Sequence, residues 1–105
     1  MAESEVVSAG SVEALAEGGM VVVELGGVEV LVTRSAGTVY ALDNECSHRG
    51  CNLSDGDVSG HEIACPCHGA IFDLRNGAVL DGPAPSAQRI YPVRVANGQI
   101  EVDAE

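Results

Sequence analysis

Cys46-Ser47-His48-Arg49-Gly50-Cys51 is the first of two short segments that carry thiol and imidazole groups close together, and Cys65-Pro66-Cys67-His68-Gly69 is the second. Sixteen residues separate His48 from Cys65, and all four cysteines of the chain lie in these two segments. Glycine and proline stand beside the candidate ligands, where they permit irregular backbone that approaches a bound group closely. Because thiolate and imidazole together bind zinc, copper or iron, the two segments predict a metal centre held between two loops.

Three interpretations of this donor set are open from the residues alone. Structural zinc pairs like ligands in its usual spacings, whereas each segment here offers both kinds. A disulfide framework requires an oxidising compartment, and the acidic start Met1-Ala2-Glu3-Ser4-Glu5 lacks the basic and apolar character of a secretion signal. The third is a [2Fe-2S] centre in which two histidines replace two cysteines on one iron, which suits mixed segments because each loop then spans both irons.

Cys46-Ser47-His48 and Cys65-Pro66-Cys67-His68 resemble the two ligand loops of the Rieske iron–sulfur family. The surrounding segments that fit the family pattern are Leu53-Ser54-Asp55-Gly56, Ile71-Phe72-Asp73, Gly77 and Gly82-Pro83-Ala84-Pro85. This resemblance covers nearly the whole chain. It implies a Rieske-type [2Fe-2S] cluster in which Cys46 and Cys65 bind one iron, while His48 and His68 bind the other.

The net charge of such a cluster predicts its redox behaviour. Two ferric ions, two sulfides, two thiolates and two neutral imidazoles sum to zero, so adding an electron costs less than in a cluster with four thiolates. We therefore expect a reduction potential within roughly −150 to +300 mV. Because the bound imidazoles can lose protons, this potential should fall at alkaline pH, and a flat profile between about pH 7 and 11 would contradict this expectation.

The resemblance also assigns roles to residues beside the cluster. In the cytochrome bc-type branch of the family, the positions of Cys51 and Cys67 are joined by a disulfide; the other interpretation is two small buried thiols. That branch has hydroxyl donors to the cluster sulfurs where this chain has Ala70 and Phe72, which predicts a potential below the bc-type range. Arg49 stands where leucine is usual in that branch, either as a solvated charge or as a docking residue. The residues expected around the cluster are Arg49, Pro66, Ala70, Phe72 and Pro83.

Alternating segments on both sides of the loops predict an antiparallel β scaffold. Strands are expected at residues 5–10, 20–25, 28–34, 38–42, 90–95 and 99–102. Ser11 predicts a capped helical turn, and Gly26-Gly27 and Asn97-Gly98 predict tight hairpin turns. Pro92 has no N–H to donate, which places its strand at an edge or a bulge. His61 matches no ligand position and is expected in an exposed loop.

The 105 residues are the size of one domain. The resemblance implies an all-β fold with an antiparallel β sandwich or barrel as its base, formed by residues 1–42 and 73–105. A small cluster-binding subdomain is expected between these parts, at residues 43–72.

Charge and hydropathy exclude several classes of partner. Sixteen acidic residues face five basic ones, for a net charge of −11, so the chain has no basic face for nucleic acid and favours a positively charged protein. No apolar run approaches the roughly 18 residues that a membrane span requires. The sequence predicts a soluble, cytoplasmic protein.

A cluster with four protein ligands has no open coordination position, so it passes an electron without binding a small-molecule substrate. The resemblance therefore implies a ferredoxin, not itself an enzyme, that carries electrons from a flavin-containing reductase to a terminal, aromatic-ring-hydroxylating oxygenase. One alternative is the small subunit of a larger oxidoreductase such as a nitrite reductase. Another, of a different class, is a zinc-stabilised interaction module.

Overall fold

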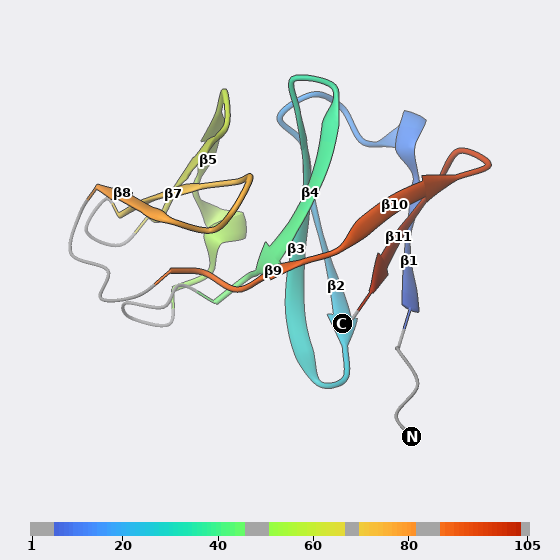
Figure 1. The fold of residues 1–105 in the computed structure, drawn as a ribbon, viewed down its shortest axis with the longest axis horizontal. Helices are drawn as coiled ribbons and strands as arrows, with labels where there is room; N and C mark the ends of the chain where they lie inside the picture. The colour runs from blue at the N-terminus through green and yellow to red at the C-terminus, as the bar shows by residue number, and fades with distance from the viewer. Residues whose placement is uncertain (1–5, 46–50, 67–69, 82–86, 104–105) are drawn as a thin grey trace.

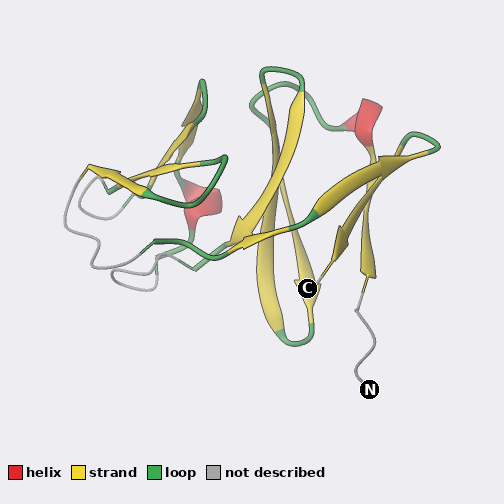
Figure 2. Ribbon diagram, viewed as in Figure 1, coloured by secondary structure: helices red, strands yellow, loops and turns green. Residues whose placement is uncertain are grey.

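The computed structural model of the chain describes residues 6–45, 51–66, 70–81 and 87–103. Within these ranges eleven strands form three antiparallel sheets, and the only helices are two 3-10 turns (Figures 1 and 2). The elements are β1 (Val6–Ser11), η1 (Val12–Ala14), β2 (Met20–Leu25), β3 (Val28–Ser35), β4 (Thr38–Asp43), η2 (Leu53–Asp55), β5 (Asp57–Ser59), β6 (Glu62–Ala64), β7 (Ile71–Asp73), β8 (Val79–Asp81), β9 (Ile90–Tyr91), β10 (Val93–Ala96) and β11 (Gln99–Asp103). The predicted all-β class is confirmed.

Two of the sheets form the base of the molecule, with strand orders β1-β11-β10 and β2-β3-β4-β9. Their tight turns lie where the glycines predict them. Gly26 and Gly27 have φ angles of 61° and 87°, and Asn97 and Gly98 have φ angles of 54° and 76°. Two successive positive φ angles are the geometry of the hairpin turn that matches the twist of the flanking strands. The predicted turn after Ser11 is also present, and the Ser11 side chain accepts a hydrogen bond from the Glu13 N–H.

Pro92 marks the point where the chain leaves one base sheet for the other. On one side of it, Tyr91 in β9 pairs with Ala41 of β4; on the other side, Val93 in β10 pairs with Val102 of β11. Since proline cannot donate to a strand ladder, the single strand expected at residues 90–95 is divided into two. Both pieces are edge strands of their sheets, as Pro92 predicts.

The sheet β2-β3-β4-β9 is a middle layer that contributes to two separate cores. Val30 and Val32 of β3 pack with Ile100 and Val102 in the core of the base. Leu31, which points to the opposite face, belongs to a second core with residues of β4, η2, β6 and β7. Residues 30–33 are therefore all fully buried, because a strand covered on both faces has no solvent side.

The third sheet, of order β5-β6-β7-β8, lies at one end of the molecule, opposite β1 and β10 (Figure 1). It extends past residue 72, where the sequence placed the end of the cluster-binding subdomain: β8 pairs with β7 through Ile71 with Asp81 and Phe72 with Val79. A strand of three residues is too short to show an alternating pattern, so β8 could not be predicted from the sequence. The chain returns to the middle sheet at β9.

Candidate metal centre

Of the four predicted ligands, the structure describes Cys65, whereas Cys46, His48 and His68 lie outside the described residues. Arg49, Cys67 and Pro83 lie outside them as well. Among the other residues expected around the cluster, Pro66 is exposed, and Ala70 and Phe72 are fully buried. The segments from which the two ligand loops start are among the described residues.

The second ligand loop begins at the end of a strand pair. Ala64 of β6 pairs with Ile71 of β7, and one residue further on the Cys65 N–H donates to the Ala70 carbonyl oxygen, with 2.7 Å between N and O. Cys65 itself is 3% exposed. This bond continues the ladder beyond the last strand residues, so the segment between Cys65 and Ala70 leaves the sheet from a fixed base.

The first ligand loop is also closed at its base. Glu45 and Asn52 form an antiparallel bridge, and the Leu53 N–H donates to the Asn44 carbonyl oxygen at 2.7 Å. The Asn44 side chain, 1% exposed, accepts a further hydrogen bond at its Oδ1 from the Ser54 N–H at 2.9 Å. Entry and exit of this loop are thus held together by main-chain and side-chain bonds.

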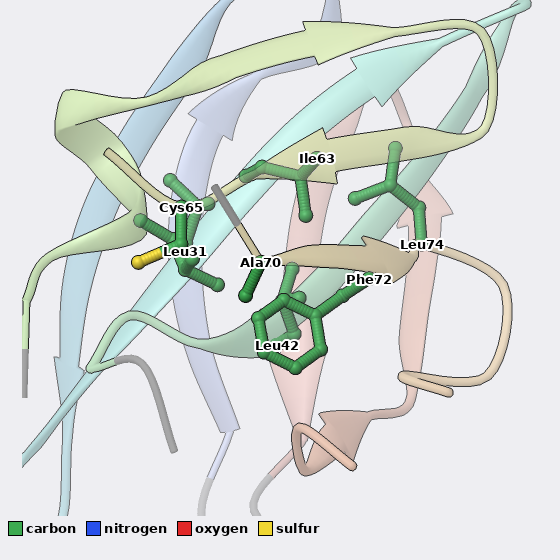
Figure 3. Packing of buried hydrophobic residues seen from close by; sticks show 8 residues of the cluster. Leu31, Leu42, Ile63, Cys65, Ala70, Phe72 and Leu74 are labelled. Carbon is green, nitrogen blue, oxygen red and sulfur yellow. The ribbon is translucent and has the colours of Figure 1, made fainter. Parts of the chain in front are cut away.

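Both loops start from one apolar cluster. Its buried members are Leu31, Leu42, Leu53, Ile63, Cys65, Ala70, Phe72 and Leu74, and the half-buried Cys51 packs against it. Figure 3 shows Cys65, Ala70 and Phe72 on two adjacent segments, facing the leucines of the middle sheet. The Cys65 thiol therefore lies in a dry environment, where exposure of a metal group to solvent would be restricted.

Cys51 is disulfide-bonded. The resemblance to the Rieske family implies a disulfide at this position, with Cys67 as its partner. Cys67 lies outside the described residues, so the pairing of Cys51 with Cys67 stays a prediction.

The residues present fit a Rieske-type group. The described donor, Cys65, is a buried thiol in apolar surroundings at the start of a loop that carries the predicted imidazole. Within residues 6–45, 51–66, 70–81 and 87–103, no three His, Cys, Asp or Glu side chains are grouped to hold a metal ion.

One ion pair and one tyrosine near these loops have shifted pKa values. Asp73, at the end of β7, accepts bonds from the Arg75 Nε and Nη2 at 3.0 and 2.9 Å, and these bonds hold the pKa of Asp73 below its usual range. Tyr91 donates to the Asp43 carboxylate, and the Arg89 guanidinium lies 4.8 Å from its ring centre. Burial, followed by the bond to Asp43, raises the pKa of Tyr91 to about 12.

Two polar residues at the site are not predicted by any sequence motif, and the environment of His61 differs from the expected exposed loop. Asn44 and Gln88 are 1% and 4% exposed and make side-chain bonds at the base of the first ligand loop. Neither belongs to a motif, and their only sequence signal is an amide next to a predicted strand. His61 is half-buried and packs edge-on against the Tyr40 ring, because the β5–β6 turn lies against β4.

The fold and the site together define a class of protein: a small all-β domain in which two closed loops extend from a shared apolar core to hold a metal group. The family is shown by comparison with known proteins. The model of the Rieske [2Fe-2S] domain matches residues 5–92, and the chain belongs to this family. Its cofactor is accordingly a [2Fe-2S] cluster. None of the helices in the described ranges has the length and apolar character needed to cross a membrane.

Three of the similar proteins match this chain over nearly their full length. The ferredoxin component of the naphthalene 1,2-dioxygenase/salicylate 5-hydroxylase systems of Ralstonia sp. is 33% identical, covering 94% of this chain and 95% of that protein. A chain in a complex of reduced oxygenase and oxidized ferredoxin of carbazole 1,9a-dioxygenase is 26% identical, with a TM-score of 0.91 and coverages of 95% and 94%. A putative NADH-dependent nitrite reductase small subunit from Mycobacterium tuberculosis is 27% identical, with a TM-score of 0.88 and coverages of 99% and 98%.

Proposed function

We propose that the chain carries single electrons from a flavin-containing reductase to a terminal oxygenase that hydroxylates an aromatic ring. The main observation behind this proposal is the end-to-end similarity to a ferredoxin component of such a system. The match covers 94% of this chain and 95% of that ferredoxin component, which supports the same role, a carrier that catalyses no reaction of its own.

In this proposal Cys46 and Cys65 hold one iron, and His48 and His68 hold the other. The bound cluster supplies one-electron redox chemistry. The described residues keep the site rigid and dry: Cys65 is buried, and the bases of both loops are fixed by hydrogen bonds. The imidazole edges of His48 and His68 would be the exit for the electron, at the surface that meets the partner.

The partners follow from charge and from the ligand set. With a net charge of −11, the chain favours partners with a basic docking surface, and electrostatic attraction would speed their encounter at low ionic strength. Nucleic acid, membrane and a directly bound small-molecule substrate are not part of the proposal. The carrier would work in the cytoplasm, where burial beside the cluster would protect the disulfide of Cys51 from reduction.

The test begins with the purified protein reduced by dithionite. We expect a reddish-brown protein with two irons per chain and an electron paramagnetic resonance spectrum whose average g value is below 2. Cys65→Ser should abolish this spectrum, whereas Cys51→Ser should retain the iron, because Cys51 is not expected to be a ligand. Colourless protein with stoichiometric zinc would contradict the proposal and favour the zinc-stabilised module.

A second candidate function has structural support. The similarity to a putative nitrite reductase small subunit covers 99% of this chain. In this second function, the domain would be a permanent subunit of a larger enzyme. The two functions differ in partner affinity. A carrier should shuttle electrons from a reductase to an oxygenase while eluting separately from both in gel filtration, whereas a subunit should co-elute with a catalytic chain.

A further inference from the structure

Residues 43–45, which lead directly into the first predicted ligand, are bonded from several sides. The Asp43 N–H donates to the Arg89 carbonyl oxygen at 2.9 Å, and the Asn44 N–H donates to the Glu29 carbonyl oxygen at 3.0 Å. The Asn44 Nδ2 also donates to the Glu29 carboxylate at 3.1 Å. Cys46 follows Glu45 without an intervening residue, so whatever fixes this segment also limits where the first thiol can lie.

The Gln88 side chain completes this set of bonds. Its Nε2 donates to the Asp43 and Glu45 carbonyl oxygens, both at 2.9 Å, so both protons of the amide are used on either side of Asn44. Gln88 is 4% exposed. Both bonds are partly buried, so losing them would remove a donor from each of two carbonyl oxygens that have limited access to water, at a cost above that of an exposed bond.

The main chain of Gln88 is linked through Gly77 to β7, the strand that follows the other ligand loop. The Gln88 N–H donates to the Gly77 carbonyl oxygen at 2.8 Å, and the Gly77 N–H donates to the Asp73 carbonyl oxygen at 2.7 Å. Asp73 is the last residue of β7, the strand onto which the second ligand loop returns. One residue therefore links the entry of the first loop, through its side chain, to the exit strand of the second loop, through its backbone.

We propose that Gln88 is a positioning residue that fixes the two ligand loops relative to each other. The inference rests on the proposed function, since it assumes that both loops hold one cluster. Each iron of a mixed-ligand cluster takes donors from both loops, so a change in loop separation alters the geometry at both metals. Gln88 itself is not a ligand; it acts through the carbonyl groups that flank Asn44.

The experiment compares Gln88→Met with Gln88→Asn and the wild type. Methionine keeps the length and approximate volume of the side chain but removes both donors, whereas asparagine keeps the amide on a chain too short to reach both carbonyl oxygens. The control is Thr33→Val. The buried Thr33 hydroxyl also donates to a main-chain carbonyl oxygen, that of Gly19, at 2.7 Å, but this bond lies in the base and not at the ligand loops.

Two readouts separate positioning from general stability: the rate of iron loss to an excess of chelator, and the line width of the electron paramagnetic resonance spectrum of the reduced protein. We expect Gln88→Met to lose iron about tenfold faster than the wild type and to broaden the spectrum, with Gln88→Asn between them. Thr33→Val should lower the melting temperature yet leave both readouts within about twofold of the wild type.

The proposal is overturned if Gln88→Met retains the wild-type rate and line width, or if Thr33→Val changes them as much. Should Gln88→Met fail to fold, Gln88→Asn decides by the same comparison. The wild-type spectrum keeps the two proposals apart. If the wild type lacks a Rieske signal, the proposed function fails; if it has the signal and the variants match it, only the positioning role of Gln88 fails.

Discussion

At the scale of single residues, Phe72 and Ala70 define the polarity around the buried Cys65. Both are fully buried in the apolar cluster to which Cys65 belongs. Neither side chain has a polar atom, so neither can donate a hydrogen bond to a sulfur atom. Hydrogen bonds to sulfur stabilise the more negative, reduced state of an iron–sulfur cluster and raise its potential. Their absence at these two positions predicts a low potential for a Rieske protein.

We therefore expect Phe72→Tyr to raise the reduction potential. One added hydrogen bond that strengthens on reduction by about 0.5–1.5 kcal/mol corresponds to a rise of about 20–65 mV for one electron. Protein-film voltammetry or a dye-coupled redox titration would measure it. Tyr40→Phe is the control, because Tyr40, in β4, packs against the same apolar cluster of side chains as Phe72. An unchanged or lower potential in Phe72→Tyr would show that the new hydroxyl does not reach the sulfur atoms.

At the scale of elements, the turn after β7 and the segment before β9 approach each other closely at Gly77. A Cβ atom at this position would lie 2.1 Å from the Gln88 carbonyl oxygen, and the φ angle of Gly77 is +77°. Glycine is needed here for two reasons, a left-handed backbone and the absence of a side chain. The contact joins the third sheet to the middle sheet beside the bases of the ligand loops.

Comparing Gly77 with Gly98, which has nearly the same φ angle, distinguishes the cost of the backbone conformation from the cost of the steric clash. Gly98, in the β10–β11 turn, has a φ of +76° but no atom within 4 Å of an added Cβ. Gly98→Ala should cost about 1–2 kcal/mol of unfolding free energy from backbone strain alone. Gly77→Ala should cost that amount plus the clash, at least about 3 kcal/mol in total. Urea unfolding of both variants measures the difference, and equal losses would mean that the Gln88 backbone moves aside at little cost.

At the scale of the whole molecule, Tyr91 couples folding to pH. It is 6% exposed in the core of the base, and its hydroxyl bonds to Asp43 at the end of β4. Its pKa is raised to about 12, from an ordinary value near 10, first by burial and then by the bond to Asp43. The fold thus favours the neutral phenol. The neutral Tyr91 phenol therefore contributes fully to the unfolding free energy below about pH 10, and this contribution is lost as the pH rises toward 12.

The two-unit shift corresponds to about 2–3 kcal/mol, of which about half should be lost by pH 11. Tyr91→Phe removes the hydroxyl, so it should cost about 1–3 kcal/mol at pH 8, where the bond to a carboxylate is intact. The difference in unfolding free energy between the wild type and Tyr91→Phe should then shrink between about pH 10 and 11. Urea unfolding of both proteins over this range tests the prediction, and a constant difference would contradict the raised pKa.

Local sequence determined the hairpins and the family of this protein. Gly26-Gly27 and Asn97-Gly98 fix their turns because positive φ angles cost glycine and asparagine little, and this preference needs no distant contact. The cysteines and histidines of the two mixed segments left three interpretations open, and the resemblance of these segments to the Rieske family selected the [2Fe-2S] cluster among them. The ligand assignment of Cys46, His48, Cys65 and His68 follows from that resemblance and stays a proposal.

Tertiary structure decided what depends on surroundings. β8 is too short to have a pattern of its own, and it exists because β7 offers an open edge. Residues 30–33 of β3 are buried on both faces only because the third sheet covers the side that the base leaves open. Gln88 and Asn44 belong to no sequence motif. Their side chains form hydrogen bonds at the base of the first ligand loop only because the fold places main-chain partners next to them. Backbone preference is a property of one or two residues, whereas burial and hydrogen-bond partners belong to the folded chain as a whole.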